Sequence, residues 1–225
     1  MSSRTFLAVV IAAAAIGGCG SSDDWSEPHA GPVAVGTVGP GFIDAKHPPA
    51  PEATITPTPG SWDGVHPAKG YRVVLLASGD DAPSRTLVDA VHRWAKDEDV
   101  SLKTVRAAGV KQYVPRIVEA MDLEPDLILV TGNGFVDPLA LVSANHLDQQ
   151  FLVLGAEIAE PTDNVTAANW PGAAFRGEGL NMRDTYDPKT FTPERADQAL
   201  RAGVAAVLSG HTGYVIRVDA GEARY

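Results

Sequence analysis

The stretch Asp126–Val142, DLILVTGNGFVDPLALV, shows the fold of this chain most clearly. It opens on a short, continuous apolar run, which is typical of a strand buried on both faces of a sheet. The run stops at Gly132-Asn133-Gly134 and is followed by an apolar segment with Pro138 at its start, where a helix tolerates proline. The stretch therefore predicts a strand, a turn and a helix, and the turn faces either a ligand or water.

The same alternation of strand-length apolar runs and helical periods extends on both sides of this stretch. Strands are expected at 71–78, 102–107, 126–132, 151–157 and 164–170, and helices at 83–96, 111–121, 138–146 and 196–208. Hairpin signals are missing between them, which favours a parallel sheet covered on both faces. The predicted fold class is α/β, a single doubly wound parallel-sheet lobe over residues 70–225, long enough to fold alone.

In such sheets ligands bind outside the carboxyl ends of the strands. Carboxylates, amides and an aromatic ring follow the predicted strands, and they could accept hydrogen bonds from hydroxyls or stack on a planar ring. The candidate ligand-binding residues are Asp80, Asp81, Asn133, Phe135, Asp137, Glu157 and Asn169. A local alternative stays open, because Asp80 or Asp81 could simply cap a helix and Asn133-Gly134 could simply form a turn.

The first twenty residues, MSSRTFLAVVIAAAAIGGCG, place one Arg before an apolar run too short for a stable membrane span. This pattern predicts an export signal over residues 1–18. Ile16-Gly17-Gly18-Cys19 resembles the bacterial lipobox, which implies cleavage before Cys19 and attachment of lipid to its sulfur. The expected location is the outer side of a bacterial cell membrane, held by that anchor. The alternative is an ordinary secretory signal with an incidental cysteine.

Residues 19–69 differ in character from the rest of the chain. They hold nine of the 17 prolines and show no sustained periodicity, so we expect a disordered tether. With flexible-chain scaling its ends would lie on the order of 40 Å apart. Whether Trp25 and Trp62 dock on the lobe stays open.

Charge and motif content exclude several classes of function. The formal net charge of -10 leaves no electrostatic footprint for nucleic acid. With one cysteine, the chain has no disulfide framework and no CxxC site. It lacks a G-x-S-x-G elbow, a Walker A sequence and a paired-histidine motif, and its six histidines are scattered. We therefore expect a protein that is not an enzyme and that needs no metal or cofactor.

Several segments in order, among them VVLLASGDDAPSRTLVDAVHRWAKDE, PDLILVTGNGFVDPLALVSANHLDQQFLVLGAE and NVTAANWPGAAFRGEG, resemble the basic membrane protein family. Those proteins are nucleoside-binding lipoproteins of ABC importers with a two-lobed, type I periplasmic-binding fold. The resemblance places Asp81 at the family's acidic residue after the first strand, Gly134-Phe135 at its Gly-Phe pair and Asn164-Val165 at its Asn-Val pair. It also places Asp137 near a second carboxylate that contacts ribose. The implied function is the solute-binding component of an ABC importer, with a nucleoside-like ligand and a permease partner.

The chain also departs from that pattern. Arg85 stands near the position of an aromatic stacking residue, and an insertion occupies 180–195. In the family, residues 203–218 would form the crossover helix and opening strand of a second lobe, so we expect a truncated or degenerate first lobe, completed by a partner or by self-association. Alternatively, residues 196–218 complete the sheet of the first lobe. A different class of function also stays open, a non-transport envelope lipoprotein acting as a protein-interaction or structural module.

Overall fold

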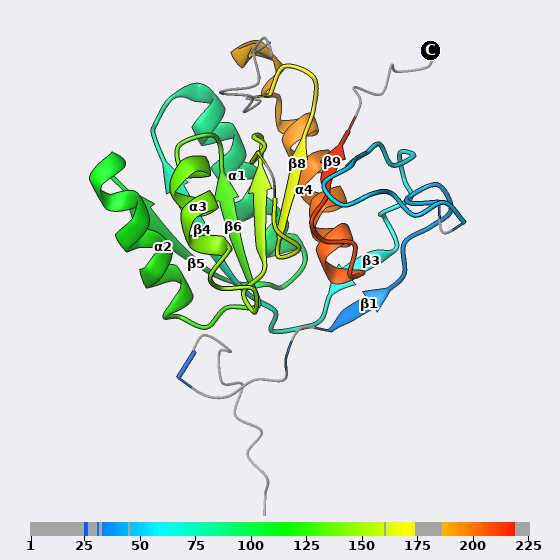
Figure 1. Ribbon diagram of the computed structural model, residues 1–225, viewed down its shortest axis with the longest axis horizontal. Coiled ribbons are helices and arrows are strands. Elements are labelled where there is room, and N and C mark those ends of the chain that lie inside the picture. The colour runs from blue at the N-terminus through cyan, green and yellow to red at the C-terminus, as the bar shows by residue number, and fades with distance from the viewer. Residues whose placement is uncertain are drawn as a thin grey trace, which may run out of the picture.

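The computed structural model describes residues 25–26, 31, 33–44, 46–159, 161–173 and 186–218. Its centre is a seven-stranded parallel sheet with the order β2-β9-β8-β7-β6-β4-β5 (Figure 1). The strands are β2 (Thr54–Ile55), β4 (Arg72–Ser78), β5 (Ser101–Ala107), β6 (Leu127–Thr131), β7 (Phe151–Leu154), β8 (Val165–Asn169) and β9 (Val215–Arg217). We call the edge where these strands begin the base, and the edge where they end the carboxyl edge. The predicted α/β fold with a doubly wound parallel sheet is confirmed.

Helices cover both faces of the sheet. They are α1 (Ala82–Asp97), α2 (Tyr113–Met121) with the short turn η1 (Val110–Gln112) before it, α3 (Val136–Ser143) and α4 (Pro193–Leu208), preceded by η2 (Pro188–Thr190). α1 and α4 share one hydrophobic core with alternate residues of β4, and α2 and α3 share a second core with the residues between them (Figure 1). This alternation follows from the two-residue period of a strand. Two cores on opposite faces explain why the strands read as continuous apolar runs.

α4 and β9 belong to the same sheet as the strands before them. β9 pairs with β8 in parallel, with Ile216 opposite Ala168. α4 packs closely over the sheet at Gly203. A Cβ at this position would lie only 2.8 Å from the Cβ of Ala168 and from Cδ1 of Leu152, so a larger residue would not fit without a shift. The expectation of a crossover into a second lobe is therefore wrong, and the alternative, in which residues 196–218 complete the first lobe, holds.

Residues 33–44 and 46–69, which were expected to belong to a tether, pack on the lobe, so the boundary at residue 70 must be corrected. β2 pairs with β9, and β1 (Ala34–Gly36) pairs with β3 (Val65–Pro67) in a small antiparallel sheet. Phe42 and Trp62 are buried in the core shared with α1 and α4. Periodicity does not reveal the packing of this segment, because a few large side chains and three short strands hold it in place.

His211, in the turn between α4 and β9, provides a pH test of this packing. Its ring stacks on Phe42 with centroids 5.9 Å apart, and burial lowers the pKa of His211 below its ordinary value. The neutral ring therefore stabilises the fold above a pH of about 6.5, and this contribution is lost as the pH falls through the folded-state pKa. When the pH is lowered from about 7.5 to about 5, the free energy of unfolding, measured in urea, should fall less in His211→Gln than in the parent protein. Equal losses would contradict this prediction.

Within the described residues, no helix is both long and apolar enough to cross a bilayer. The expected signal peptide, residues 1–18, and the expected lipid attachment point, Cys19, lie outside the described residues.

Candidate functional site

A cavity of about 380 Å³ opens at the carboxyl edge. It lies over the ends of β4 and β6, the neighbouring strands at which the order of the sheet reverses, and extends to the end of β7. This switch point is where doubly wound sheets bind their ligands. The lining residues are Ser78, Gly79, Asp81, Pro83, Ser84, Leu87, Tyr113, Gly132, Asn133, Gly134, Gly155, Tyr186 and Phe191.

Glycines at the strand ends make room for the cavity. Gly79, Gly132 and Gly155 follow β4, β6 and β7, and each has a positive φ of 72 to 75°. That conformation is accessible to glycine without strain. Gly134 serves a different purpose, because a Cβ there would collide with Oγ of Ser78 and lie 3.1 Å from the hydroxyl oxygen of Tyr113. The glycines let two hydroxyl-bearing side chains face the same space.

Asp81 is both the N-cap of α1 and part of the cavity lining. Its Oδ1 accepts a hydrogen bond from the Ser84 backbone N–H at 2.9 Å, and its Oδ2 accepts one from the Ser84 hydroxyl at 3.1 Å. The local alternative considered from the sequence is therefore real. The capping hydrogen bonds still leave the Asp81 carboxylate able to bind a ligand, because each oxygen can accept a second hydrogen bond.

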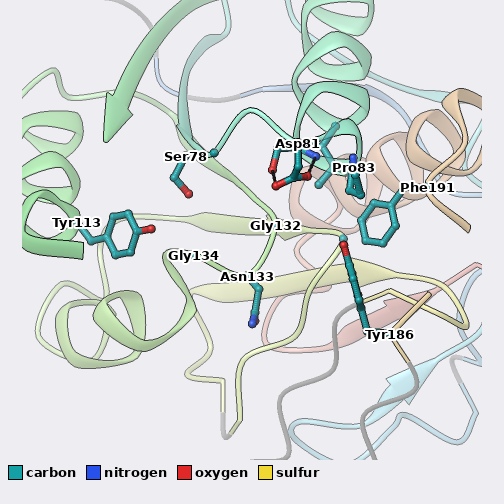
Figure 2. A pocket seen from close by; sticks show the side chains of 13 residues that line it. Ser78, Asp81, Pro83, Tyr113, Gly132, Asn133, Gly134, Tyr186 and Phe191 are labelled. Atoms are coloured by element: carbon teal, nitrogen blue, oxygen red, sulfur yellow. Dashed lines mark hydrogen bonds between the residues drawn. The ribbon is translucent and has the colours of Figure 1, made fainter. Parts of the chain in front are cut away.

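Aromatic side chains stand on opposite sides of the cavity. Figure 2 shows Tyr113 and Ser78 on one side and Tyr186 and Phe191 on the other, with Asp81 at the start of α1 between them. The Phe191 ring packs edge-on against Trp170, with centroids 5.0 Å apart, and its centroid lies 5.6 Å from that of Tyr186. Trp170 in turn donates from its indole N–H to Oγ1 of Thr190 at 3.0 Å. This chain of contacts holds the second aromatic wall in place.

Of the seven candidate residues, the structure brings only Asp81 and Asn133 into the cavity lining. Asp80 is exposed beside it, and its backbone oxygen accepts a hydrogen bond from the guanidinium of Arg85. Asp137 is exposed in the first turn of α3 and does not line the cavity. Phe135 is fully buried and packs on Tyr113 at 4.7 Å in the core beneath α2 and α3, so its ring cannot reach a ligand.

Glu157 and Asn169, the remaining two candidates, form a separate buried cluster at the carboxyl edge. The side-chain amide of Asn169 donates to Oε1 of Glu157, and Nη2 of Arg217 donates to the same oxygen at 2.9 Å. Glu157 is 5% exposed, and its carboxylate forms an ion pair with Arg217. These residues hold the end of β9 to the end of β8 and the segment after β7, and they do not line the cavity.

Sequence reasoning missed the aromatic residues of the cavity. Tyr113 begins α2, a position read only as part of a helix, and Tyr186 and Phe191 lie in the stretch regarded as an insertion. Two aromatic residues five positions apart in an otherwise polar stretch were the available signal. Nothing in the local sequence indicates that this stretch returns to the switch point.

The part of the cavity wall that the structure describes carries no positive charge. Its charged lining residue is Asp81, and no Lys, Arg or His lies among the lining residues. Within the described residues there is also no group of three His, Cys, Asp or Glu side chains that could hold a metal ion. Hydroxyls, an amide and a carboxylate between aromatic walls suit an uncharged or cationic polar molecule with a flat face. They do not suit a phosphate, which needs cationic partners or free backbone N–H groups.

No protein-family model matches the chain, and no curated protein matches its sequence. Solved structures match part of it. An ABC transporter solute-binding protein from Aeropyrum pernix K1 shares 19% identity, covering 44% of this chain and 28% of that one, with a TM-score of 0.40. One from Conexibacter woesei DSM 14684 shares 17%, covering 44% and 35%, with a TM-score of 0.38. A fragment of a presumed lipoprotein from Peptoclostridium difficile 630 shares 17%, covering 61% and 98%, with a TM-score of 0.45.

The chain thus spans less than two thirds of the length of both solute-binding proteins. At these identities and TM-scores the likeness does not indicate what the cavity binds.

Proposed function

We propose that this protein is an exported, lipid-anchored lobe that binds a small, uncharged polar metabolite with a planar ring, of the nucleoside type. The observation that carries the proposal is the cavity at the switch point, lined by Ser78, Asp81, Asn133 and Tyr113 and walled by Tyr186 and Phe191. Rings between aromatic walls bury flat apolar surface, and the polar groups set the orientation of the ligand. The resemblance to nucleoside-binding lipoproteins of ABC importers suggests the same class, with a permease as partner.

Among the described lining residues there is no Lys, Arg or His, which narrows the proposed ligand class further. A phosphorylated ligand would bring negative charge beside Asp81 without compensation. A ribose or similar group would instead offer hydroxyls to its carboxylate, and hydrogen bonds to a charged acceptor are the stronger kind. An unphosphorylated nucleoside therefore fits this cavity better than a nucleotide.

Thermal unfolding of the chain without residues 1–18 tests this proposal with nucleosides, nucleobases and the matching 5′-monophosphates. At a ligand concentration about 100 times Kd, binding adds about 2.7 kcal/mol, or roughly 5 to 10 °C in Tm. We expect such a shift with a nucleoside and none with its monophosphate. Asp81→Asn should keep the Tm of the unliganded protein, because Asn caps helices as well as Asp does, and should reduce the shift.

Asp187→Asn is the matched control. Asp187 caps η2 through a hydrogen bond from the Lys189 backbone N–H at 3.0 Å and does not line the cavity. It should leave the ligand shift unchanged. A folded protein whose Tm no compound shifts would refute ligand binding. An undiminished shift in Asp81→Asn would remove Asp81 from the binding site.

A second candidate function, a protein-interaction module, has one observation in its favour. Val110, Val114 and Val118 follow each other at four-residue spacing along η1 and α2, and all three are exposed. Residues so spaced share one face of a helix, and apolar residues grouped on an exposed face can mark a contact surface. This function becomes the better reading if the ligand panel gives no thermal shift.

A further inference from the structure

Trp25 binds at the base of the sheet, in a site that we call its seat, formed by Arg72, Ser101 and Lys103. These residues lie far from Trp25 in the sequence. Its indole N–H donates to Oγ of Ser101, the first residue of β5, at 2.7 Å. Nζ of Lys103 lies 4.4 Å from the centre of the ring, and the guanidinium carbon of Arg72 lies 5.6 Å from it. Nη1 of Arg72 also donates to the backbone oxygen of Trp25 at 3.4 Å. The ring further packs against the core beneath α2 and α3.

Trp25 makes hydrogen bonds, cation–π contacts and apolar contacts at the same time. The ring buries apolar surface, attracts two cations through its quadrupole and uses its single donor on a hydroxyl. A residue that merely adhered to an apolar surface would not match the positions of a donor, two cations and a carbonyl at once. The contacts therefore define a binding seat for this one side chain.

The seat and the ligand cavity lie at opposite edges of the sheet. Arg72 and Ser101 begin β4 and β5, whereas Ser78, which lines the cavity, ends β4. Six residues separate Arg72 from Ser78, which corresponds to about 20 Å along a strand. The base of the sheet and the mouth of the cavity therefore face opposite ways.

The position of Trp25 in the chain sets how far the lobe can move from Cys19. Trp25 lies six positions after Cys19, a reach of at most about 20 Å. If the contacts of residues 25 and 26 were lost, the next described residue to hydrogen-bond to the lobe would be Val33, whose backbone oxygen accepts a hydrogen bond from the Ala68 N–H at 2.9 Å. The reach from Cys19 would then be about 50 Å, enough for the lobe to turn over.

We propose that Trp25 docks the N-terminal segment on the base of the sheet, so that the anchored lobe turns its base to the bilayer and opens the cavity away from it. This inference rests on the proposed membrane anchoring at Cys19. Ligand then enters from the side remote from the membrane. Delivery to a permease in the same membrane requires Trp25 to leave its seat, which frees the longer reach.

Energy transfer to lipid tests the orientation. Residues 19–225 carrying Cys19→Ser, with a hexahistidine in place of residues 1–18, are bound to vesicles that contain nickel-chelating and acceptor-labelled lipids. A donor dye is placed on Asp148→Cys, exposed at the base before β7, or on Val110→Cys, 79% exposed on the cavity side beyond β5. We expect about twofold or more energy transfer from residue 148 than from residue 110, because the two positions differ in height by most of the length of a strand.

Trp25→Ala should abolish this difference. Val35→Ala, which changes an exposed residue of the same N-terminal segment, should preserve it. Equal transfer from the two positions in the parent protein would overturn the proposal, as would a difference that survives Trp25→Ala. Since hexahistidine replaces the lipid, the outcome is independent of lipidation and of ligand binding. Those are measured separately, by palmitate incorporation into the full chain and by thermal shift.

Discussion

Asn164→Ala is expected to lower the free energy of unfolding by at least about 3 kcal/mol. Asn164 is 1% exposed, and its amide nitrogen donates to the backbone oxygens of Ser143, His146 and Gln149 at 3.1, 2.9 and 3.0 Å. Its side-chain oxygen accepts a hydrogen bond from Oγ1 of Thr162 at 2.6 Å. Truncation takes the Asn164 partner from the Gln149 carbonyl and the Thr162 hydroxyl, whereas the carbonyls of Ser143 and His146 keep the N–H groups of His146 and Gln149. Each group left without a partner in the interior costs about 1 to 3 kcal/mol.

Equilibrium unfolding in urea measures this loss, with Asn145→Ala as the matched control. Asn145 is exposed, and its amide makes one long contact of 3.4 Å with the Leu141 backbone oxygen. The control should stay within about 0.5 kcal/mol of the parent protein. Asn164→Asp should be at least as damaging as the alanine variant, because a carboxylate cannot donate to the carbonyls. A loss below about 1 kcal/mol in Asn164→Ala would contradict the prediction.

Phe135→Ala should destabilise the protein by about 3 to 5 kcal/mol. Phe135 is 0% exposed, lies between β6 and α3 and packs on Tyr113, which lines the cavity. The substitution leaves a void that the surrounding strands can fill only in part, since cores of this kind are close-packed. Any loss of ligand binding in this variant would follow from the displacement of Tyr113 rather than from a lost contact between ligand and Phe135.

Leu141→Ala is the control for this prediction, since it removes a large apolar side chain from α3, the helix that follows Phe135. Leu141 is 73% exposed, so its change should be nearly neutral in urea. Phe135→Leu should recover most of the stability, because it restores apolar volume. If Phe135→Ala unfolds with the same midpoint as the parent, the ring is not part of the core and a direct role in binding has to be considered again.

Asn164 and Phe135 show that a match to a family position did not by itself predict the role of a residue. Both were matched to family positions, and Phe135 was expected to contact a ligand. In the structure both residues stabilise the fold. Asn164 donates hydrogen bonds to three carbonyls, and Phe135 packs on Tyr113. Asp81 is the case in which the two readings coincide, because one carboxylate caps α1 and faces the cavity.

The strands and helices could be read from sequence because the local pattern of this chain is strong. Runs such as 73–77 and 127–130 are apolar throughout, and Asp81 and Pro83 mark the start of α1. Parallel pairing follows from that alternation, whereas the strand order, and with it the switch point between β4 and β6, is known only from the structure. The segment 33–69 could not be read in this way, since its order depends on Phe42, Trp62 and the pairing of β2 with β9 rather than on any period of its own.

The sequence by itself determined the α/β class and the edge of the sheet at which a site would lie, because both follow from patterns within a few residues. It left open whether Asp80 or Asp81 caps a helix. Only the tertiary structure decided that Phe135 is buried, that Tyr186 and Phe191 wall the cavity and that Trp25 sits on β4 and β5. These contacts join residues far apart in the sequence, such as Tyr113 with Phe135, 22 positions apart, and Trp25 with Ser101, 76 positions apart. No local pattern encodes such a distance, because the free energy of each contact exists only once the sheet has brought its partners together.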